Sequence, residues 1–328
     1  LVVNAQHMKA VPGRKTDVKD SEWICDLLRH GLLKASYIPD RNQRELRELV
    51  RYRRSLIQER AREHNHIQKV LEGANIKLAS VVSDIMGLSS RDMLEAMVNG
   101  ESNPETLAGF ARRTMKKKKE ELELALRGNM SSHQRMMLKT MLTHIDFLSE
   151  QIAELDTEVA KRLAPFQQDL DRLDSIPGVA RRTAEQILAE VGTDIASRFP
   201  SAAHLCSWVG LVPGQNESAG KRKSSKTRKG NKYLRSALTE AAQSIRGSDN
   251  YLGAQYRRIA ARKGKRRAAV AVAHSIMTIT YYLLTRQEEY RDLGSDYFEK
   301  RHQDAIVRQT VRKLENLGLL RLVSYCLF

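Results

Sequence analysis

Three residues, one serine and two aspartates, have types and positions that could carry chemistry. Ser218 lies between the turn residues Gly214 and Gly220, where the backbone can bring a small nucleophile close to a ligand. Serine beside glycine is also a common turn residue, and the sequence offers no evident histidine and aspartate partners for it. From the residues alone, both interpretations stay open.

The two aspartates begin a predicted helix. Asp17 and Asp20 are followed by apolar residues at helical spacing from Trp23 to Leu28. Residues three apart share a helix face, where two carboxylates can hold a divalent cation such as Mg²⁺. The alternative is capping by Thr16 or Asp17, with acidic charge in the first turn favoured by the helix dipole. Spacing alone leaves both hypotheses open.

The stretch after the serine is dense in positive charge. Between Lys221 and Arg235 there are eight Lys or Arg and no carboxylate. This charge creates a strongly positive electrostatic potential, which cannot be buried in a packed core. We expect a polyanion as the partner, and Ser224 and Ser225 are rival nucleophiles ranked below Ser218. The predicted nucleic-acid contacts of this stretch are Lys221, Arg222, Lys223, Lys226, Arg228, Lys229, Lys232 and Arg235.

A helical hairpin is predicted upstream of this stretch. Leu173 to Val179, followed by a helix from Thr183 to Glu190, resembles a helix-hairpin-helix, in which turn amides contact a DNA phosphate. Gly178 and Arg181 are the predicted phosphate contacts. A second glycine is usual where this chain has Ala180, so a purely structural turn is the alternative. In the helix that is predicted to follow from residues 199–201, Trp208 and Leu211 are expected to make core contacts.

Long helices are predicted in the middle of the chain. Residues 41–78 have apolar residues at helical spacing, in a seam that Arg53 and Arg60 interrupt. A break is predicted at residues 99–104, and Lys116 to Lys119 are either a solvated face or a nucleic-acid contact. A helix from Ser131 or Ser132 to about Leu163 carries a heptad seam that could pair with the preceding helix as a hairpin or with another subunit. The seam consists of Leu138, Met141, Ile145, Leu148, Ile152, Leu155 and Val159.

Composition points to a nucleic-acid partner in a reducing compartment. The 328 residues suggest two or three domains, and the formal charge of +17 suits nucleic acid or an anionic membrane surface. The three cysteines are far apart, which supports neither a disulfide framework nor a zinc site. Without a visible signal peptide, secretion is not expected and a reducing cytoplasm fits best.

Two further segments bear on these expectations. The apolar stretch from Ala268 to Leu284 is alanine-rich and short for a membrane span, so a buried core helix is predicted and no membrane association is expected. A second basic cluster from Arg257 to Arg267 holds seven Lys or Arg without an acid and is expected to follow a phosphate backbone.

The motifs resemble those of one family. Residues 7–39, HMKAVPGRKTDVKDSEWICDLLRHGLLKASYIP, look like the segment that closes the RNase-H-like domain of DEDD-type insertion-sequence transposases, the IS110/IS1111 family. The motifs GLVP (210–213), ESAGK (217–221) and GNKYLR (230–235) are similar to the family's C-terminal transposase domain. The resemblance covers nearly the whole chain and is strongest at residues 4–39 and 205–298.

The resemblance implies a mechanism. Ser218 takes the position of the family's nucleophile, which attacks a DNA phosphodiester, and Asp17 and Asp20 take those of the last two acids of a four-carboxylate Mg²⁺ site. The two parts meet across subunits of a homo-oligomer, a dimer or tetramer, whose assembly uses a coiled-coil middle domain. A structured guide RNA pairs with donor and target DNA.

One departure from the family limits this expectation. The family's first Asp and its Glu lie upstream, on strands, and this sequence starts after their positions. We therefore expect this fragment to bind Mg²⁺ weakly and to be inactive or impaired. The rival hypotheses are a non-enzymatic DNA- or RNA-binding protein from a decayed element, and a metal-only resolvase that uses water as nucleophile.

The predicted fold is mainly α, in three parts. Residues 1–40 are the C-terminal remnant of an RNase-H-like α/β domain, with a strand in the first five residues. Residues 41–165 form a helical, coiled-coil domain. Residues 166–328 form a helical transposase domain that carries the serine.

Overall fold

The computed structural model describes residues 17–33, 38–214, 217–218, 221–222, 224, 226–301 and 303–317. Most of these residues are helical and the described strands are two residues long each, so the predicted mainly α class is confirmed. They belong to two compact units, one made of residues 1–47 and 166–328 and the other of residues 48–165. The strand predicted at residues 1–5 lies outside the described residues, and the RNase-H-like remnant stays a prediction.

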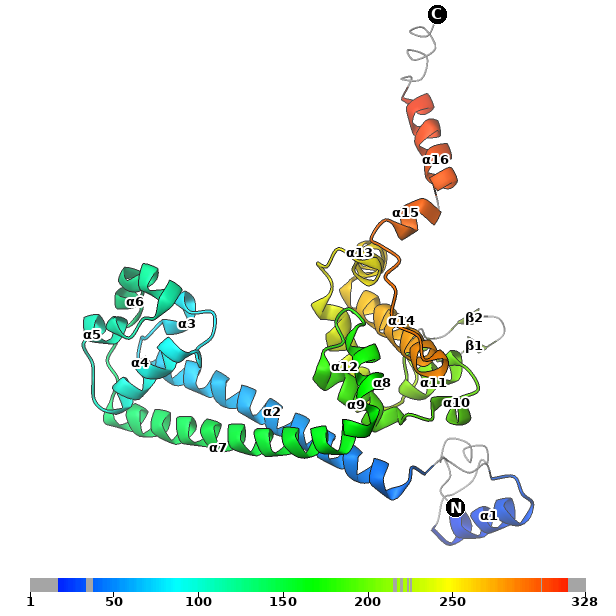
Figure 1. Ribbon diagram of the computed structural model, residues 1–328, viewed down its shortest axis with the longest axis horizontal. Helices are drawn as coiled ribbons and strands as arrows, with labels where there is room; N and C mark the ends of the chain where they lie inside the picture. The colour runs from blue at the N-terminus through cyan, green and yellow to red at the C-terminus, as the bar shows by residue number, and fades with distance from the viewer. Residues whose placement is uncertain are drawn as a thin grey trace, which may run out of the picture. The chain divides into compact units, whose positions relative to one another are not determined.

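The unit of residues 48–165 is a helical hairpin with a small helical cap at one end (Figure 1). Its elements are α2 (Arg41–Gly73), which begins in the other unit, α3 (Leu78–Val81), α4 (Leu88–Val98), α5 (Pro104–Gly109), the 3-10 helix η2 (Arg113–Lys118), α6 (Lys119–Ala125) and α7 (Ser132–Leu163). The predicted break is present, because α5 starts at Pro104 with Asn103 as its N-cap.

The two long helices pack antiparallel. Ser131 caps α7 through a capping box with Gln134. Arg53 bonds Asp156 at 2.8 Å, and Arg60 bonds Ser149 at 3.1 Å, so residue numbers rise on α2 as they fall on α7. The α7 seam therefore pairs within the chain, through a cluster of Leu56, Leu148 and Ile152.

Arg53 interrupts the apolar seam of α2 in the sequence but does not break the packing. Its side chain is 3% exposed and lies 2.8 Å from the carboxylate of Asp156. A buried cation is tolerated when a carboxylate neutralises it. Pairing of the α7 seam with a second subunit stays a prediction.

A glycine fixes the connection between the cap helices and α7. The Asn129 amide donates to the Ala74 carbonyl at 3.0 Å, and the Lys77 amide donates to the Ala125 carbonyl at 2.7 Å. These bonds bring Gly128 against the backbone after α2. A Cβ at Gly128 would overlap the Ala74 carbonyl and lie 2.5 Å from Ile76 Cγ1.

The other unit contains α1 and the helices from α8 onward, with η3 (Ala164–Phe166) at its boundary. Its helices are α1 (Asp17–Arg29), α8 (Gln167–Asp174), α9 (Arg181–Val191), α10 (Ile195–Arg198), α11 (Ala202–Val209), α12 (Lys232–Ser244), α13 (Tyr251–Lys263), α14 (Lys265–Arg286), α15 (Tyr297–Arg301) and α16 (Gln303–Asn316). Two short strands, β1 (Glu217–Ser218) and β2 (Lys221–Arg222), pair antiparallel.

The helix α14 is the core of this unit. It packs against α8 and α10 to α13, and its buried side chains include Val272, Ile276, Met277 and Leu284. Among the described helices it is the one long and apolar enough to cross a membrane, but 56% of that window is buried within the fold. The predicted buried core helix is confirmed.

Replacing Gly128 by alanine should destabilise the 48–165 unit. The new methyl group would overlap the backbone after α2, and such overpacking costs about 1–3 kcal/mol. Chemical denaturation of the wild type and of Gly128→Ala would measure the loss. Gly109→Ala is the matched control, because a Cβ there meets nothing within 4 Å. Equal stability of the two variants would contradict the close approach.

Candidate catalytic and nucleic-acid-binding site

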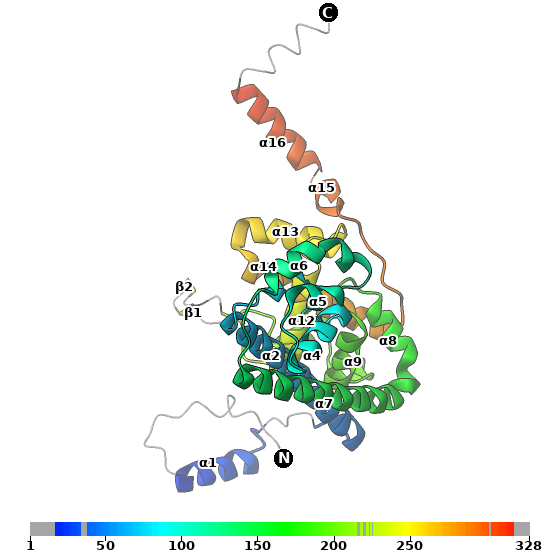
Figure 2. The same cartoon turned by 90° about the vertical axis from the view of Figure 1, so that its left-hand side faces the viewer.

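The basic stretch is a paired arm. Pro213 bridges Thr227, the Gly214 amide donates to the Lys226 carbonyl at 2.9 Å, and farther along Ser218 pairs with Lys221. Both views show β1 and β2 standing off the helices of their unit (Figures 1 and 2). We call residues 211–230 the basic arm. Its described pairs run from a base beside α11 and α12 to the pair that contains Ser218.

Two glycines allow the base of the basic arm to close. Gly210 ends α11 with φ 84°, which suits glycine. A Cβ on Gly210 would lie 2.8 Å from the Arg228 carbonyl, and a Cβ on Gly230 would lie 2.5 Å from the Gly210 amide nitrogen. The two backbone segments therefore touch directly, and larger residues would separate them.

A buried carboxylate connects the base of the basic arm to the helices. Asn231 Oδ1 accepts from the Tyr233 and Leu234 amides, which caps α12. Its Nδ2 donates to Glu190 Oε2 at 2.6 Å, and Arg47 Nε lies 3.2 Å from the same oxygen. Glu190 is 2% exposed, so these partners offset the cost of burying its charge.

The end of α9 is held by side chains from two other elements. The Ala189 carbonyl accepts from Gln43, the Glu190 carbonyl accepts from Arg47 at 2.7 Å, and the Val191 carbonyl accepts from Arg198 at 2.6 Å. The last carbonyls of a helix lack intrahelical partners, and cations there also suit the dipole. The start of α2 is thus locked to α9.

The described cations of the basic arm and α12 are available to a ligand. Lys226 and Lys229 are exposed, Arg228 is 3.4 Å from Ser207 Oγ, and Lys232 lies over the Tyr233 ring. No carboxylate of the described residues forms an ion pair with these four or with Arg235. Of the other predicted contacts, Lys221 and Arg222 are described by their backbone, and Lys223 lies outside the described residues.

Lys232 and Arg235 also occupy the first turn of α12, which carries no acid. The dipole disfavours cations at a helix N-terminus by about 0.3–1 kcal/mol each. An anion bound beside this turn would reverse that penalty.

The predicted hairpin forms between α8 and α9, but its glycine faces inward. A Cβ at Gly178 would lie 2.6 Å from the Ala241 carbonyl and 2.8 Å from Ile245. Arg181 bonds Glu185 at 3.1 Å and Gln167 at 3.0 Å. This packing favours the structural turn, and nucleic-acid contact by Gly178 and Arg181 stays a prediction.

The predicted aspartates lie in the first turn of α1, three residues apart. Their side chains are outside what the structure describes, and among the described side chains no three His, Cys, Asp or Glu gather at one point. Two carboxylates at this spacing suit Mg²⁺, which commonly takes one or two carboxylates together with water and substrate phosphates. The ligand role of Asp17 and Asp20 stays a prediction.

One sequence prediction near the basic arm is wrong. Trp208 was expected to make core contacts, but its side chain is 38% exposed. The buried face of α11 is formed by Leu205, Cys206 and Val209. Trp208 lies on another face and contacts Phe199, with ring centroids 5.5 Å apart.

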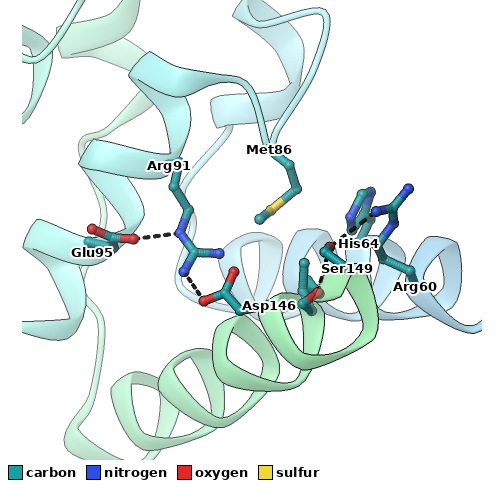
Figure 3. Close-up of a pocket in the computed structure, with 8 residues that line it drawn as sticks. Arg60, His64, Met86, Arg91, Glu95, Asp146 and Ser149 are labelled. Carbon is teal, nitrogen blue, oxygen red and sulfur yellow. Dashed lines mark hydrogen bonds and ion pairs between the residues drawn. The ribbon is translucent and has the colours of Figure 1, made fainter. Parts of the chain in front are cut away.

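A pocket of about 610 Å³ lies between α2, α4 and α7 (Figure 3). Arg91 bonds Glu95 and Asp146, each at 2.6 Å, so its charge is neutralised and α4 is tied to α7. Burial, with Arg60 nearby, lowers the pKa of His64, which leaves the ring mainly neutral at pH 7. The pocket lacks the surplus of cations that a phosphate site needs.

Models of known protein families match two parts of the chain. A transposase model of the IS116/IS110/IS902 family matches residues 170–257, and a DEDD-type transposase model of IS110 elements matches residues 1–76. Together the two models match half of the chain. The chain belongs to the IS110/IS116 transposase family. The first match contains Glu190, Ser218 and Asn231, and the second contains Asp17 and Asp20.

Relatives agree with this family. The transposase for insertion sequence element IS1111A of Coxiella burnetii is 25% identical over 299 residues, which is 88% of this chain and 72% of that protein. A putative transposase of Sinorhizobium fredii is 33% identical over 150 residues, 44% of this chain and 38% of that protein. A pilin gene-inverting protein of Moraxella bovis is 26% identical over 149 residues, 43% of this chain and 46% of that protein.

Sequence reasoning missed three residues that position the site of this family member. Glu190 stands in the apolar run ILAEV, and an acid among buried residues was an available signal. Asn231, directly before a helix and after a glycine, has a capping signature. Arg47 gave no signal, because its partner is 143 positions away.

Changing Asn231 to aspartate should destabilise the base of the basic arm. Aspartate caps helices as well as asparagine does, but it would lose the donor to Glu190 and place a second carboxylate beside a buried one. We expect a loss of about 1–3 kcal/mol, measured by denaturant unfolding. Asn231→Ser, which keeps a capping oxygen without the second charge, should lose less. An aspartate variant as stable as the wild type would contradict the role of Glu190.

Proposed function

We propose that this chain acts in transposition of an insertion sequence, as a recombinase that cleaves and rejoins DNA through the Ser218 hydroxyl. The observation that carries the proposal is the pairing of Ser218 with Lys221 in an arm whose described cations, Lys226, Arg228 and Lys229, form no ion pair with a described carboxylate. Membership of the transposase family supports transposition as the process. The name of the pilin gene-inverting relative supports DNA recombination as the class of reaction.

In the proposed step, Ser218 Oγ attacks the phosphorus of a DNA phosphodiester. An Oγ–P bond forms and the bond from phosphorus to one deoxyribose oxygen breaks. The serine proton passes to solvent and the leaving oxygen takes up a proton, so the freed strand ends in a hydroxyl and charge is balanced. Attack of a strand hydroxyl on the serine phosphodiester reverses the step and joins DNA.

The surrounding cations would supply what a serine hydroxyl lacks. Lys226, Arg228 and Lys229 can grip the backbone on either side of the scissile phosphate, and the charge on the phosphoryl oxygens is stabilised by fixed positive groups. Asp17 and Asp20 would hold Mg²⁺, which polarises a phosphoryl oxygen. The anchored base of the basic arm favours a fixed geometry for these groups.

The resemblance extends the proposal to partners and assembly. Donor and target DNA would be chosen by base pairing with a structured guide RNA, and side chains would mainly contact the backbone. The protein would act as a homo-oligomer, a dimer or tetramer, in which the aspartates of one subunit meet the serine of another. The cytoplasm is the proposed compartment.

Replacing Ser218 by alanine should abolish covalent attachment to DNA without abolishing binding. The protein would be incubated with Mg²⁺, guide RNA and both DNAs, and the adduct would be detected on a denaturing gel and mapped by mass spectrometry. We expect loss of at least about 100-fold in adduct, because removing the nucleophile removes covalent catalysis. Ser224→Ala is the matched control and should keep the adduct.

The same experiment separates the rival functions. Recombination that survives Ser218→Ala but is lost in Asp17→Ala would point to water as the nucleophile. An adduct on Ser224 or Ser225 would move the chemistry to a neighbouring serine. A wild-type protein that binds but never forms an adduct would fit either the non-enzymatic function or the impairment expected of a fragment without the family's first Asp and its Glu.

A further inference from the structure

A second basic surface lies where α13 turns into α14. Five cations occupy the end of α13 and the first turn of α14, and every one of them is exposed. They are Arg262, Lys263, Lys265, Arg266 and Arg267. Gly264 stands between the two helices with φ 84°, and a Cβ there would meet nothing within 4 Å, so the turn is open to solvent. We call these five residues the basic ridge.

The cations of the basic ridge have no partners among the described residues. Among the described residues, none of the five side chains forms an ion pair or a hydrogen bond. Two neighbours on α13 differ, since Arg257 donates to the Ser248 carbonyl at 2.7 Å and Arg258 lies 5.0 Å from the centre of the Phe298 ring. Within the fold, Arg257 and Arg258 therefore have partners, whereas the five cations of the basic ridge have none among the described residues.

The position of the basic ridge works against local stability. Lys265, Arg266 and Arg267 fill the first turn of the 22-residue helix α14, which has no acid there. The helix dipole and mutual repulsion both disfavour three cations at an N-terminus. An anion bound along the basic ridge would offset both the unfavourable dipole interaction and the repulsion between the cations. Anion binding therefore gives a reason for these three cations, which the packing of α14 does not require.

The composition of the basic ridge defines the partner. Residues 259–268 contain no aromatic side chain on which bases could stack, as single-strand binding surfaces usually do. Besides the cations, this segment has mainly small residues, Ala260, Ala261, Gly264 and Ala268, which allow a close approach. A row of point charges without stacking platforms fits the sugar–phosphate backbone of a duplex.

We propose that the basic ridge is a second nucleic-acid surface, which holds the backbone of a duplex and is built by elements other than the basic arm. This inference rests on the proposed function only in taking nucleic acid as the partner. It assigns a contact to a surface that plays no part in the serine step. A recombinase must hold more duplex than the segment at its nucleophile, and the basic ridge supplies such a hold.

The salt dependence of binding tests this assignment. In the 328-residue Ser218→Ala protein, four cations of the basic ridge would be neutralised as Arg262→Gln, Lys263→Gln, Lys265→Gln and Arg266→Gln. Binding of a 30-base-pair DNA duplex would be measured by fluorescence anisotropy over a range of salt. The slope of log K against log salt should become shallower by about 0.9 for each phosphate that the variant no longer neutralises.

A charge-matched control comes from the other unit. Lys116, Lys117, Lys118 and Lys119 are exposed, and changing all four to Gln removes the same net charge. This control should change the slope less than the ridge variant does, because Lys118 donates to the Val81 carbonyl and Lys119 pairs with Glu123. A ridge variant with Arg262→Lys and Arg266→Lys alone keeps the charge and should bind like the parent, while circular dichroism verifies folding of all variants.

The outcomes separate the basic ridge from the serine step. Equal slope changes in the ridge and Lys116 to Lys119 variants, or no change in either, would overturn the inference. A duplex RNA of the same length distinguishes the sources of the backbone: a ridge effect on either duplex supports a duplex surface and says which one it holds. Failure of the Ser218 adduct test would leave these slopes interpretable, because binding requires no chemistry.

Discussion

The buried carboxylate of Glu190 is the interaction on which the arrangement of the site depends. It is 2% exposed, and it receives Asn231 from the base of the basic arm and Arg47 from the start of α2. A carboxylate buried without partners would be very costly, and these two partners offset part of that cost. Because Asn231 also caps α12, one side chain fixes the end of the basic arm and the start of the next helix.

This anchor explains how a stretch with so many cations can be ordered at its base. The positive charges of the basic arm and α12 repel one another, and none is neutralised by a carboxylate among the described residues. Order comes from backbone contacts at Gly210 and Gly230 and from Glu190, which lies beneath them. The cations remain free for phosphates, and the stability that they lack locally is supplied by the helices of the unit.

Features set by local patterns were predictable from the sequence. The helix capped by Ser131, the break before Pro104 and the core helix α14 follow from capping residues, proline and apolar content, and all three are present. Packing of α7 against α2 was not predicted, because a heptad seam does not identify its partner. In the structure Arg53 of α2 bonds Asp156 of α7, and pairing with a second subunit stays a prediction.

The site was only partly predictable for a similar reason. Charge density marked the basic arm, and motif resemblance marked Ser218. The anchor was missed because Arg47, Glu190 and Asn231 are far apart in the chain, and the sequence does not indicate which distant residues contact one another. Residue type was also a poor guide at Trp208. A large apolar residue was expected in the core, but the Trp208 side chain lies beside the basic arm and is 38% exposed.

Amide hydrogen exchange tests the central claim that Glu190 holds the base of the basic arm. Glu190→Ala should speed exchange at Arg228, Asn231 and Tyr233 by about tenfold or more, because the anchor that it removes is worth about 1.4 kcal/mol or more. Amides of α7, in the other unit, should keep their wild-type rates. Unchanged rates at the base, or an equal acceleration throughout both units, would contradict it.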